Sequence, residues 1–163
     1  MITAVCGFLA ASGTALDIVI DDGSHVPWHN IFTLEEIFGT MLNDGGIYVI
    51  EDTETSYWDG EAANLYGMYD VRGAGVGGHR SAVERLKLVP DVLNRHFMRD
   101  EGFSVLRDRV DHMVASITFA RNCIALVKKD PRRWAALEKI DRGDDYGAKA
   151  GRTQRQPREK YLA

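Results

Sequence analysis

Two short apolar runs of this 163-residue sequence each end in a pair of acidic residues. The pairs are Asp21 and Asp22 after the run 18–20, and Glu51 and Asp52 after the run 47–50. Such runs are typical of buried parallel strands, which are apolar on both faces. In an open parallel sheet, ligands bind beyond the carboxyl ends of the strands. We therefore expect the four carboxylates to converge at one rim, where hard oxygen ligands suit Mg²⁺ or Ca²⁺.

His25 lies three residues after Asp22, on the loop that leaves the same strand. A neutral imidazole there could remove a proton from a hydroxyl that a bound metal has acidified. The alternative is that Asp22 and Ser24 cap the following helix and that His25 is a solvated loop residue. Composition alone favours this alternative, because acidic strand ends and Asp caps are common.

The elements expected around these residues form a strand–helix–strand unit. A helix is predicted over 31–42 because apolar residues recur on one face: Ile31, Leu34, Ile37, Phe38, Met41 and Leu42. The turn-forming run 43–46 should end this helix before the strand 47–50 begins. Two strands joined in this way form a βαβ unit with a right-handed crossover.

The second half of the sequence predicts one interrupted helix and three strands. The stretch 53–78 has little periodicity and indicates a long functional or mobile loop. Ser81 and Glu84 form a capping box that opens a helix, and Pro90 should kink or break it. The expected strands are 103–106, 113–120 and 123–127, with the last two in an antiparallel hairpin around Arg121 and Asn122.

Composition excludes some classes of protein. With 20 basic and 24 acidic residues, the formal net charge is −4, so the chain has no general attraction for nucleic acid or anionic lipid. The apolar opening 1–13 lacks the charged start of a secretory signal and is too short to span a bilayer, so we expect a core segment. Cys6 and Cys123 lie far apart in no zinc-binding pattern, which favours reduced thiols in a cytoplasmic protein.

Two blocks of sequence resemble a known family. The run DIVIDDGSH at 17–25 resembles the strand-4 motif of the metal-dependent macrolide-sugar O-methyltransferases, the mycinamicin and macrocin type. The run GGIYVIEDT at 45–53, followed by SYW at 56–58, resembles the next block of that family. The resemblance implies three Mg²⁺ ligands, Asp22, Glu51 and Asp52, and one general base, His25.

The resemblance extends to about residue 129 and implies a fold. Lys87, Asp91 and Asn94 resemble the family's Lys-x-x-x-Asp-x-x-Asn helix, although Pro90 departs from that pattern. The implied α/β fold is a partial Rossmann-like methyltransferase fold, in which strands 4 and 5 are parallel and a C-terminal antiparallel hairpin follows.

The S-adenosylmethionine site of such enzymes is a glycine-rich turn after the first strand. Only 16 residues precede Asp17, so we expect the C-terminal half of the fold, lacking the N-terminal cofactor-binding half. Residues 1–140 should form this partial domain, and residues 141–163 a polar, disordered tail.

Other motifs are less specific. Residues 73–78 fit the dinucleotide pattern GxGxxG, but no clear buried strand precedes them, so we expect a mobile substrate-side loop instead of a nucleotide site. Four side chains near the acidic rim are candidates for an acceptor pocket or for ordinary packing: Trp28, His29, Tyr57 and Trp58.

The implied function is Mg²⁺-assisted transfer of a methyl group from S-adenosylmethionine to a sugar or polyketide hydroxyl. The alternative is a non-catalytic remnant or partner subunit that needs complementation by a cofactor-binding half. The strand 17–20 should be an unpaired apolar edge, and the helix 31–42 should lose part of its cover. We therefore expect self-association or a partner chain, and neither a nucleic-acid nor a membrane partner.

Overall fold

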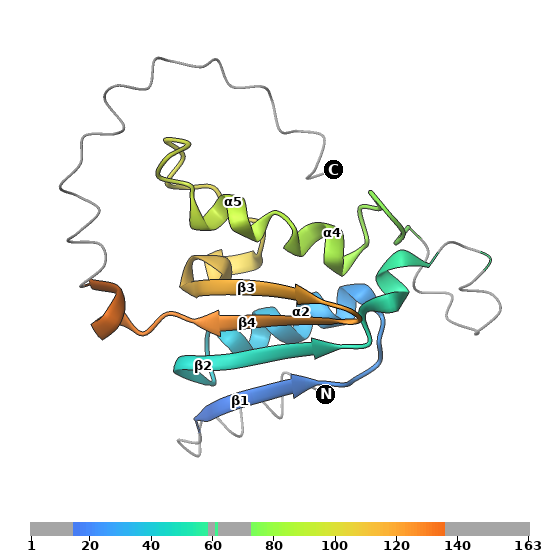
Figure 1. Cartoon of the computed structure of the whole chain (residues 1–163), viewed down its shortest axis with the longest axis horizontal. Coiled ribbons are helices and arrows are strands. Elements are labelled where there is room, and N and C mark those ends of the chain that lie inside the picture. The colour runs from blue at the N-terminus through green and yellow to red at the C-terminus, as the bar shows by residue number, and fades with distance from the viewer. Residues whose placement is uncertain (1–14, 59–60, 62–72, 136–163) are drawn as a thin grey trace.

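The computed structural model describes residues 15–58, 61 and 73–135 (Figure 1). This part of the chain contains a mixed four-stranded sheet with the strand order β1-β2-β4-β3. The strands are β1 (Leu16–Asp21), β2 (Leu42–Glu51), β3 (Val114–Ala120) and β4 (Cys123–Lys128). β1 and β2 are parallel, whereas β4 is antiparallel to both β2 and β3. The expected α/β class, parallel pair and C-terminal hairpin are confirmed.

Residues 131–135 are helical, and three α-helices and two 3₁₀-helices with both ends described accompany the sheet. They are α2 (Pro27–Phe38), η1 (Thr53–Tyr57), α4 (Ala82–Leu86), α5 (Val89–Leu93) and η3 (Arg107–Met113). The expected break at Pro90 is confirmed, because α4 ends before this residue and α5 begins beside it. The capping role of Ser81 is also confirmed, since its hydroxyl oxygen accepts a hydrogen bond from the Glu84 N–H at 3.2 Å.

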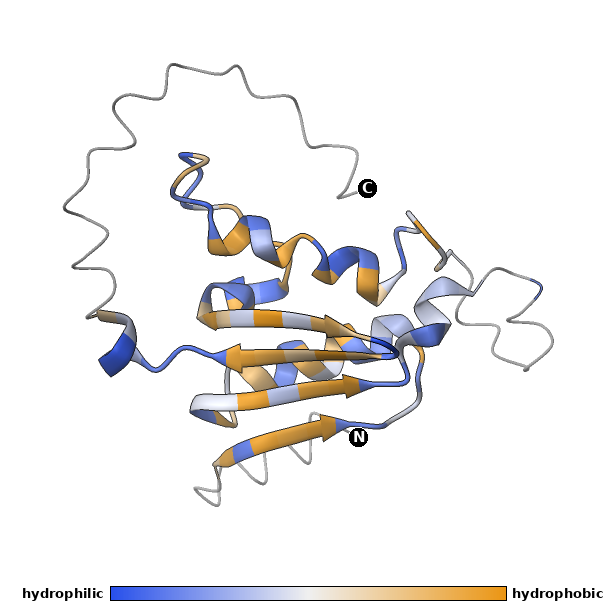
Figure 2. Ribbon diagram, in the orientation of Figure 1, coloured by the Kyte–Doolittle hydropathy of each residue, from blue (hydrophilic) through white to orange (hydrophobic). Residues whose placement is uncertain are grey.

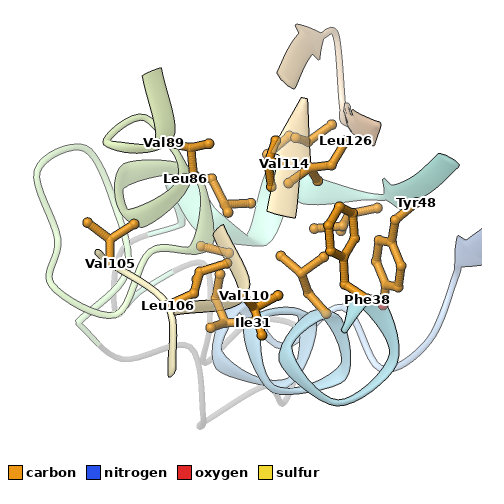
Figure 3. Close-up of a cluster of buried hydrophobic side chains, with 14 of the residues drawn as sticks. Ile31, Phe38, Tyr48, Leu86, Val89, Val105, Leu106, Val110, Val114 and Leu126 are labelled. Carbon is orange, nitrogen blue, oxygen red and sulfur yellow. The ribbon is translucent and has the colours of Figure 1, made fainter. Parts of the chain in front are cut away.

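One face of the sheet packs against α2, α4, α5 and η3 (Figure 3). Tyr48 and Ile50 of β2 are fully buried there, and the Tyr48 ring meets Phe38 of α2 edge-on with centroids 6.4 Å apart. Because Leu34 and Phe38 are completely buried in this core, the expectation that the first helix loses part of its cover is wrong. Its apolar side faces β2, α4 and η3, all of which the chain itself supplies.

The opposite face of the β1–β2 pair is apolar and exposed. Ile18 and Ile20 of β1 are 62% and 60% exposed, and Ile47 of β2 is 37% exposed. Within the described ranges, β1 pairs with β2 alone and therefore lies at the edge of the sheet, as expected. The exposed surface that the sequence analysis placed on the helix thus lies on the sheet instead.

The boundaries of the βαβ unit differ from those predicted. The helix begins at Pro27, four residues before Ile31, because proline suits the first turn of a helix. β2 begins at Leu42, and the expected turn 43–46 is an irregularity inside this strand, between the pairs Leu16–Leu42 and Ile18–Ile47. A Cβ atom at Gly46 would lie 2.8 Å from the carbonyl oxygen of Asn43, so only glycine fits this bulge.

The predicted strand 103–106 is absent, and a buried carboxylate explains why. Asp111 is fully buried, and its Oδ2 accepts hydrogen bonds from the N–H groups of Val105 and Leu106 at 2.6 and 3.2 Å. Its Oδ1 accepts a third bond, from the hydroxyl of Ser104 at 2.6 Å. A side chain, and not a neighbouring strand, therefore satisfies this segment of backbone.

Two expectations concern residues that the structure does not describe. The opening 1–13 and the tail 141–163 lie outside the described ranges, so their predicted core and disordered states stay predictions. Among the described helices, none has both the length and the apolar character needed to cross a membrane.

Candidate metal centre

The parallel pairing of β1 and β2 brings their carboxyl ends to the same rim of the sheet (Figure 1). Asp22 directly follows β1, and Asp52 directly follows β2. His25 lies on the short loop between β1 and α2. These residues are up to 30 positions apart in the sequence, and the pairing of the two strands brings them together.

Asp22, His25 and Asp52 form a compact group. One ligand atom from each lies within 4.8 Å of the others. His25 Nε2 is 3.0 Å from Asp22 Oδ1, at hydrogen-bonding distance, and 3.7 Å from Asp52 Oδ2. The expected convergence is therefore observed for Asp22 and Asp52, with the proposed base between them.

Two members of the group have an unusual backbone conformation. His25 and Asp52 have φ angles of 55° and 50°, in the left-handed region that residues other than glycine seldom adopt. The hydroxyl of Thr55 donates a 2.5 Å hydrogen bond to the carbonyl oxygen of His25, which ties the β1–α2 loop to η1. Such conformations persist only where surrounding contacts hold them, and they cluster at functional sites.

The other two acidic residues of the rim lie outside the group. Asp21 shares the covered face with its partner Ile50, and its Oδ2 accepts a hydrogen bond from the Tyr48 hydroxyl at 3.2 Å. Burial raises the pKa of the Asp21 carboxyl above its ordinary value, partly opposed by hydrogen bonds from Tyr48 and Asn30. Glu51 is exposed and follows the buried Ile50, so it stands on the opposite face of β2. Its role as a ligand stays a prediction.

The donor set of the group fits Mg²⁺. This ion is usually held by one or two carboxylates, with water completing its octahedral shell. The Asp22 and Asp52 side chains are 63% and 44% exposed, which leaves room for that water. Two carboxylates this close repel each other, and a bound cation removes the repulsion.

The predicted acceptor residues lie on elements that flank the group. Trp28 is on the first turn of α2 and lines a surface hollow of about 290 Å³ together with Ile31, Phe32, Glu35, His79, Arg80, Ser81 and Arg85. The next residue, His29, is bonded through Nδ1 to the Ser24 hydroxyl at 2.6 Å. Tyr57 is half-exposed at the end of η1, and the Trp58 N–H donates to the carbonyl oxygen of Thr55.

The remaining motifs of the sequence do not join the group. The glycine-rich stretch forms turns before α4 and is tied to η1 by a 2.9 Å hydrogen bond from the Gly75 N–H to the carbonyl oxygen of Ser56. Lys87 follows α4 and pairs with Glu84, whereas Asp91 lies in α5. The expected Lys-x-x-x-Asp-x-x-Asn helix is therefore two short helices.

Sequence reasoning missed one residue that contacts the group. Asn122, in the turn between β3 and β4, donates a hydrogen bond from Nδ2 to Asp52 Oδ1 at 2.8 Å. The two residues are 70 positions apart. Only the position of β4 beside β2 brings Asn122 to Asp52, and no local sequence pattern predicts that position.

Part of the chain is similar to curated sugar O-methyltransferases, although no family model matches it. Over 55 residues it is 47% identical to the 8-demethyl-8-alpha-L-rhamnosyl tetracenomycin-C 2'-O-methyltransferase of Streptomyces olivaceus, which is 34% of this chain and 13% of that enzyme. It is 48% identical over 52 residues to the demethylmacrocin O-methyltransferase of Streptomyces fradiae, 32% of this chain and 13% of that enzyme. The matched segment thus spans a small fraction of its relatives.

Solved structures show the same relationship at the level of the fold. The MycE methyltransferase of the mycinamycin biosynthetic pathway, in complex with Mg, SAH and mycinamycin VI, matches 78% of this chain and 29% of its own with a TM-score of 0.56 and 24% identity. A second crystal form, with Mg and SAH, matches 93% of this chain and 36% of its own with a TM-score of 0.60 and 23% identity. The chain is therefore partly homologous to the macrolide-sugar O-methyltransferases and has the fold of part of MycE.

Proposed function

We propose that this chain carries the metal and acceptor half of a Mg²⁺-assisted O-methyltransferase that uses S-adenosylmethionine and acts on a sugar or polyketide hydroxyl. In this proposal the sheet is the second half of a Rossmann-like methyltransferase fold. The observation that carries it is the convergence of Asp22, His25 and Asp52 at the rim of the sheet. The similarity of part of the chain to sugar O-methyltransferases supports it.

The proposed roles follow from the chemistry of the three side chains. Asp22 and Asp52 hold Mg²⁺, and Glu51 is the third proposed ligand. When bound, Mg²⁺ lowers the pKa of an acceptor hydroxyl. In neutral His25 one ring nitrogen carries no proton, and this nitrogen accepts the hydroxyl proton as the acceptor oxygen forms a bond to the methyl carbon and the carbon–sulfur bond of the donor breaks. The products are the methyl ether, the thioether of the spent donor and a protonated His25.

The acceptor is proposed to lie against α2. The hollow beside Trp28 combines an aromatic face with the charged groups of Glu35, Arg80 and Arg85. Sugars bind well to such surfaces, because the ring packs on the aromatic side chain and its hydroxyls bond to charged groups. His29, Tyr57 and Trp58 are the other proposed acceptor contacts.

Thermal unfolding with and without Mg²⁺ tests the metal centre. A ligand at 100 times its Kd stabilises the folded chain by about 2.7 kcal/mol. We expect the unaltered chain to show this response, and Asp22→Asn and Asp52→Asn to lose it. The matched control is Asp108→Asn, because Asp108 is also an aspartate with a positive φ, 53°, but lies outside the group. An unchanged response in Asp22→Asn would reject the site, and the response of Glu51→Gln decides whether Glu51 is a ligand.

The base is tested separately from the metal. His25→Ala should abolish methyl transfer in a complemented, active form and should leave most of the Mg²⁺ response, because the histidine acts on the acceptor proton. A His25→Ala variant that remains active would transfer the role of base to another residue, with His29 first.

A second candidate function is a non-catalytic partner subunit. The exposed apolar face of β1 and β2 favours it, because such a face is typical of a surface that another chain covers. Methyl transfer by the complemented form supports the enzyme, whereas a response to Mg²⁺ without methyl transfer, or no response to either Mg²⁺ or S-adenosylmethionine, supports the partner subunit.

A further inference from the structure

The turn between β3 and β4 lies at the same rim as the metal centre (Figure 1). β4 runs antiparallel to β2, and its first residue, Cys123, pairs with Glu51 at the end of β2. The two-residue turn that precedes Cys123 therefore stands beside Asp52. Arg121 and Asn122 form this turn.

The side-chain amide of Asn122 uses both of its polar atoms on this rim. Its Nδ2 donates to Asp52 Oδ1 at 2.8 Å, and its Oδ1 accepts from the Glu54 N–H at 2.8 Å. The carbonyl oxygen of the same residue accepts from the Thr53 N–H at 3.4 Å. Asn122 thus bonds to three consecutive residues, from the proposed ligand into η1.

The hydrogen bonds of Asn122 orient Asp52, whose position the β2 strand does not fix. Asp52 has left the strand and has a φ of 50°, so the ladder of β2 no longer fixes it. Because Asn122 occupies Oδ1, the other oxygen, Oδ2, is the one that lies 3.7 Å from His25 Nε2. The hydrogen bond therefore decides which oxygen of Asp52 faces the group.

The type of residue suits both tasks. Asn122 has a φ of 59°, a left-handed conformation that asparagine tolerates better than most residues. Glycine would take the same backbone conformation without the amide. The structural and the positioning contributions of Asn122 are therefore separable by substitution.

We infer that Asn122 is a positioning residue of the metal centre, which orients the Asp52 carboxylate for Mg²⁺ from the β3–β4 turn. This inference rests on the proposed function, because it requires Asp52 to be a ligand. A group that hydrogen-bonds to a metal ligand holds that ligand in position. Its removal typically weakens metal affinity by about 10-fold to 100-fold.

The test is a Mg²⁺ titration of the full chain, measured by isothermal titration calorimetry. Urea unfolding of the same variants measures their stability. We expect Asn122→Gly to weaken Mg²⁺ affinity by about tenfold. The matched control is Asn43→Ala, because Asn43 Nδ2 donates an equivalent 2.8 Å hydrogen bond to Asp17 Oδ1 at the opposite end of the same two strands. That variant should bind Mg²⁺ as tightly as the unaltered chain.

Urea unfolding without Mg²⁺ separates a positioning role from a purely structural one. Asn122→Gly should keep a urea midpoint close to that of Asn43→Ala while its Mg²⁺ affinity falls, whereas loss of a purely structural turn residue would lower the midpoint and leave the affinity of the folded chain unchanged. Equal Mg²⁺ affinity in Asn122→Gly and the unaltered chain, or an equal loss in Asn43→Ala, overturns the inference alone. Absence of Mg²⁺ binding by the unaltered chain rejects the proposed function and this role with it.

Discussion

The two faces of the sheet have the same kind of side chain and opposite surroundings. Ile50 of β2 is completely buried beneath the helices, whereas Ile20 of the neighbouring β1 is 60% exposed on the other face. In Figure 2 the strands are predominantly hydrophobic along their length. Strands that are apolar on both sides are typical of parallel sheets covered on both sides. The strand sequences therefore suit a sheet with a protein layer on each face, and the described residues supply the layer on one face only.

The largest expected effect is a difference in the free energy of unfolding between one substitution on each face of the sheet. Ile50→Ala should lower the free energy of unfolding by about 2–5 kcal/mol, because it opens a cavity in a packed core. Ile20→Ala should lower it by less than about 1 kcal/mol, since the exposed side chain has little packing to lose. Urea unfolding of both variants measures the difference. Similar losses would show that the face of Ile20 is covered in solution.

The next effect concerns association through the exposed face. At micromolar concentration we expect the chain to scatter light as a species larger than a monomer and to bind a hydrophobic dye. Ile18→Lys combined with Ile20→Lys should reduce both signals. The control is Val76→Lys, because Val76 is 83% exposed but lies in a loop away from the sheet. A monodisperse, dye-free monomer would contradict the prediction.

The smallest effect tests Lys128, a lysine that is buried on the covered face. Lys128 Nζ donates to the carbonyl oxygen of Leu42 at 2.7 Å. Burial lowers the pKa of Lys128 below its ordinary 10.5, partly opposed by Asp44. The folded chain therefore releases this proton at a lower pH than the unfolded chain, and stability is gained as pH rises from the lowered pKa to about 10.5.

The variant Lys128→Met removes this titration and keeps an apolar side chain of similar length. We expect the stability difference between the unaltered chain and Lys128→Met to shift in favour of the unaltered chain as pH rises on the alkaline side. Urea midpoints at a series of pH values measure it. A difference that is independent of pH would show that burial does not disfavour the charged amine.

Local patterns in the sequence predicted the elements whose causes are local. The β-branched runs, the Ser81 cap and the break at Pro90 all have causes within a few residues, and the structure confirms them. The segment 103–106 was predicted wrongly because its backbone N–H groups bond to the side chain of Asp111 instead of to a neighbouring strand. No sequence pattern used for strands signals such a bond. The apolar spacing of that segment reports burial without specifying a strand.

The site shows the same limit. Asp22, His25 and Asp52 were predictable because acids that follow two parallel strands must share a rim. The positions of Asp21 and Asp22 at the end of β1 did not by themselves separate the two acids, and the choice of Asp22 came from the resemblance to the O-methyltransferase family. Asn122 was beyond reach for a further reason: its place depends on β4 lying between β2 and β3.

The long separation between Asp52 and Asn122 has a kinetic consequence. Asp22 and His25 are three positions apart, whereas the hydrogen bond to Asp52 spans 70 positions. Closing so long a loop carries an entropic cost before any contact forms, and distant strand pairings form late in folding. We therefore expect the Asp52 carboxylate to be oriented only after the hairpin has docked on β2. Stopped-flow refolding, followed by Mg²⁺ binding and by strand formation in parallel, measures the order of the two events.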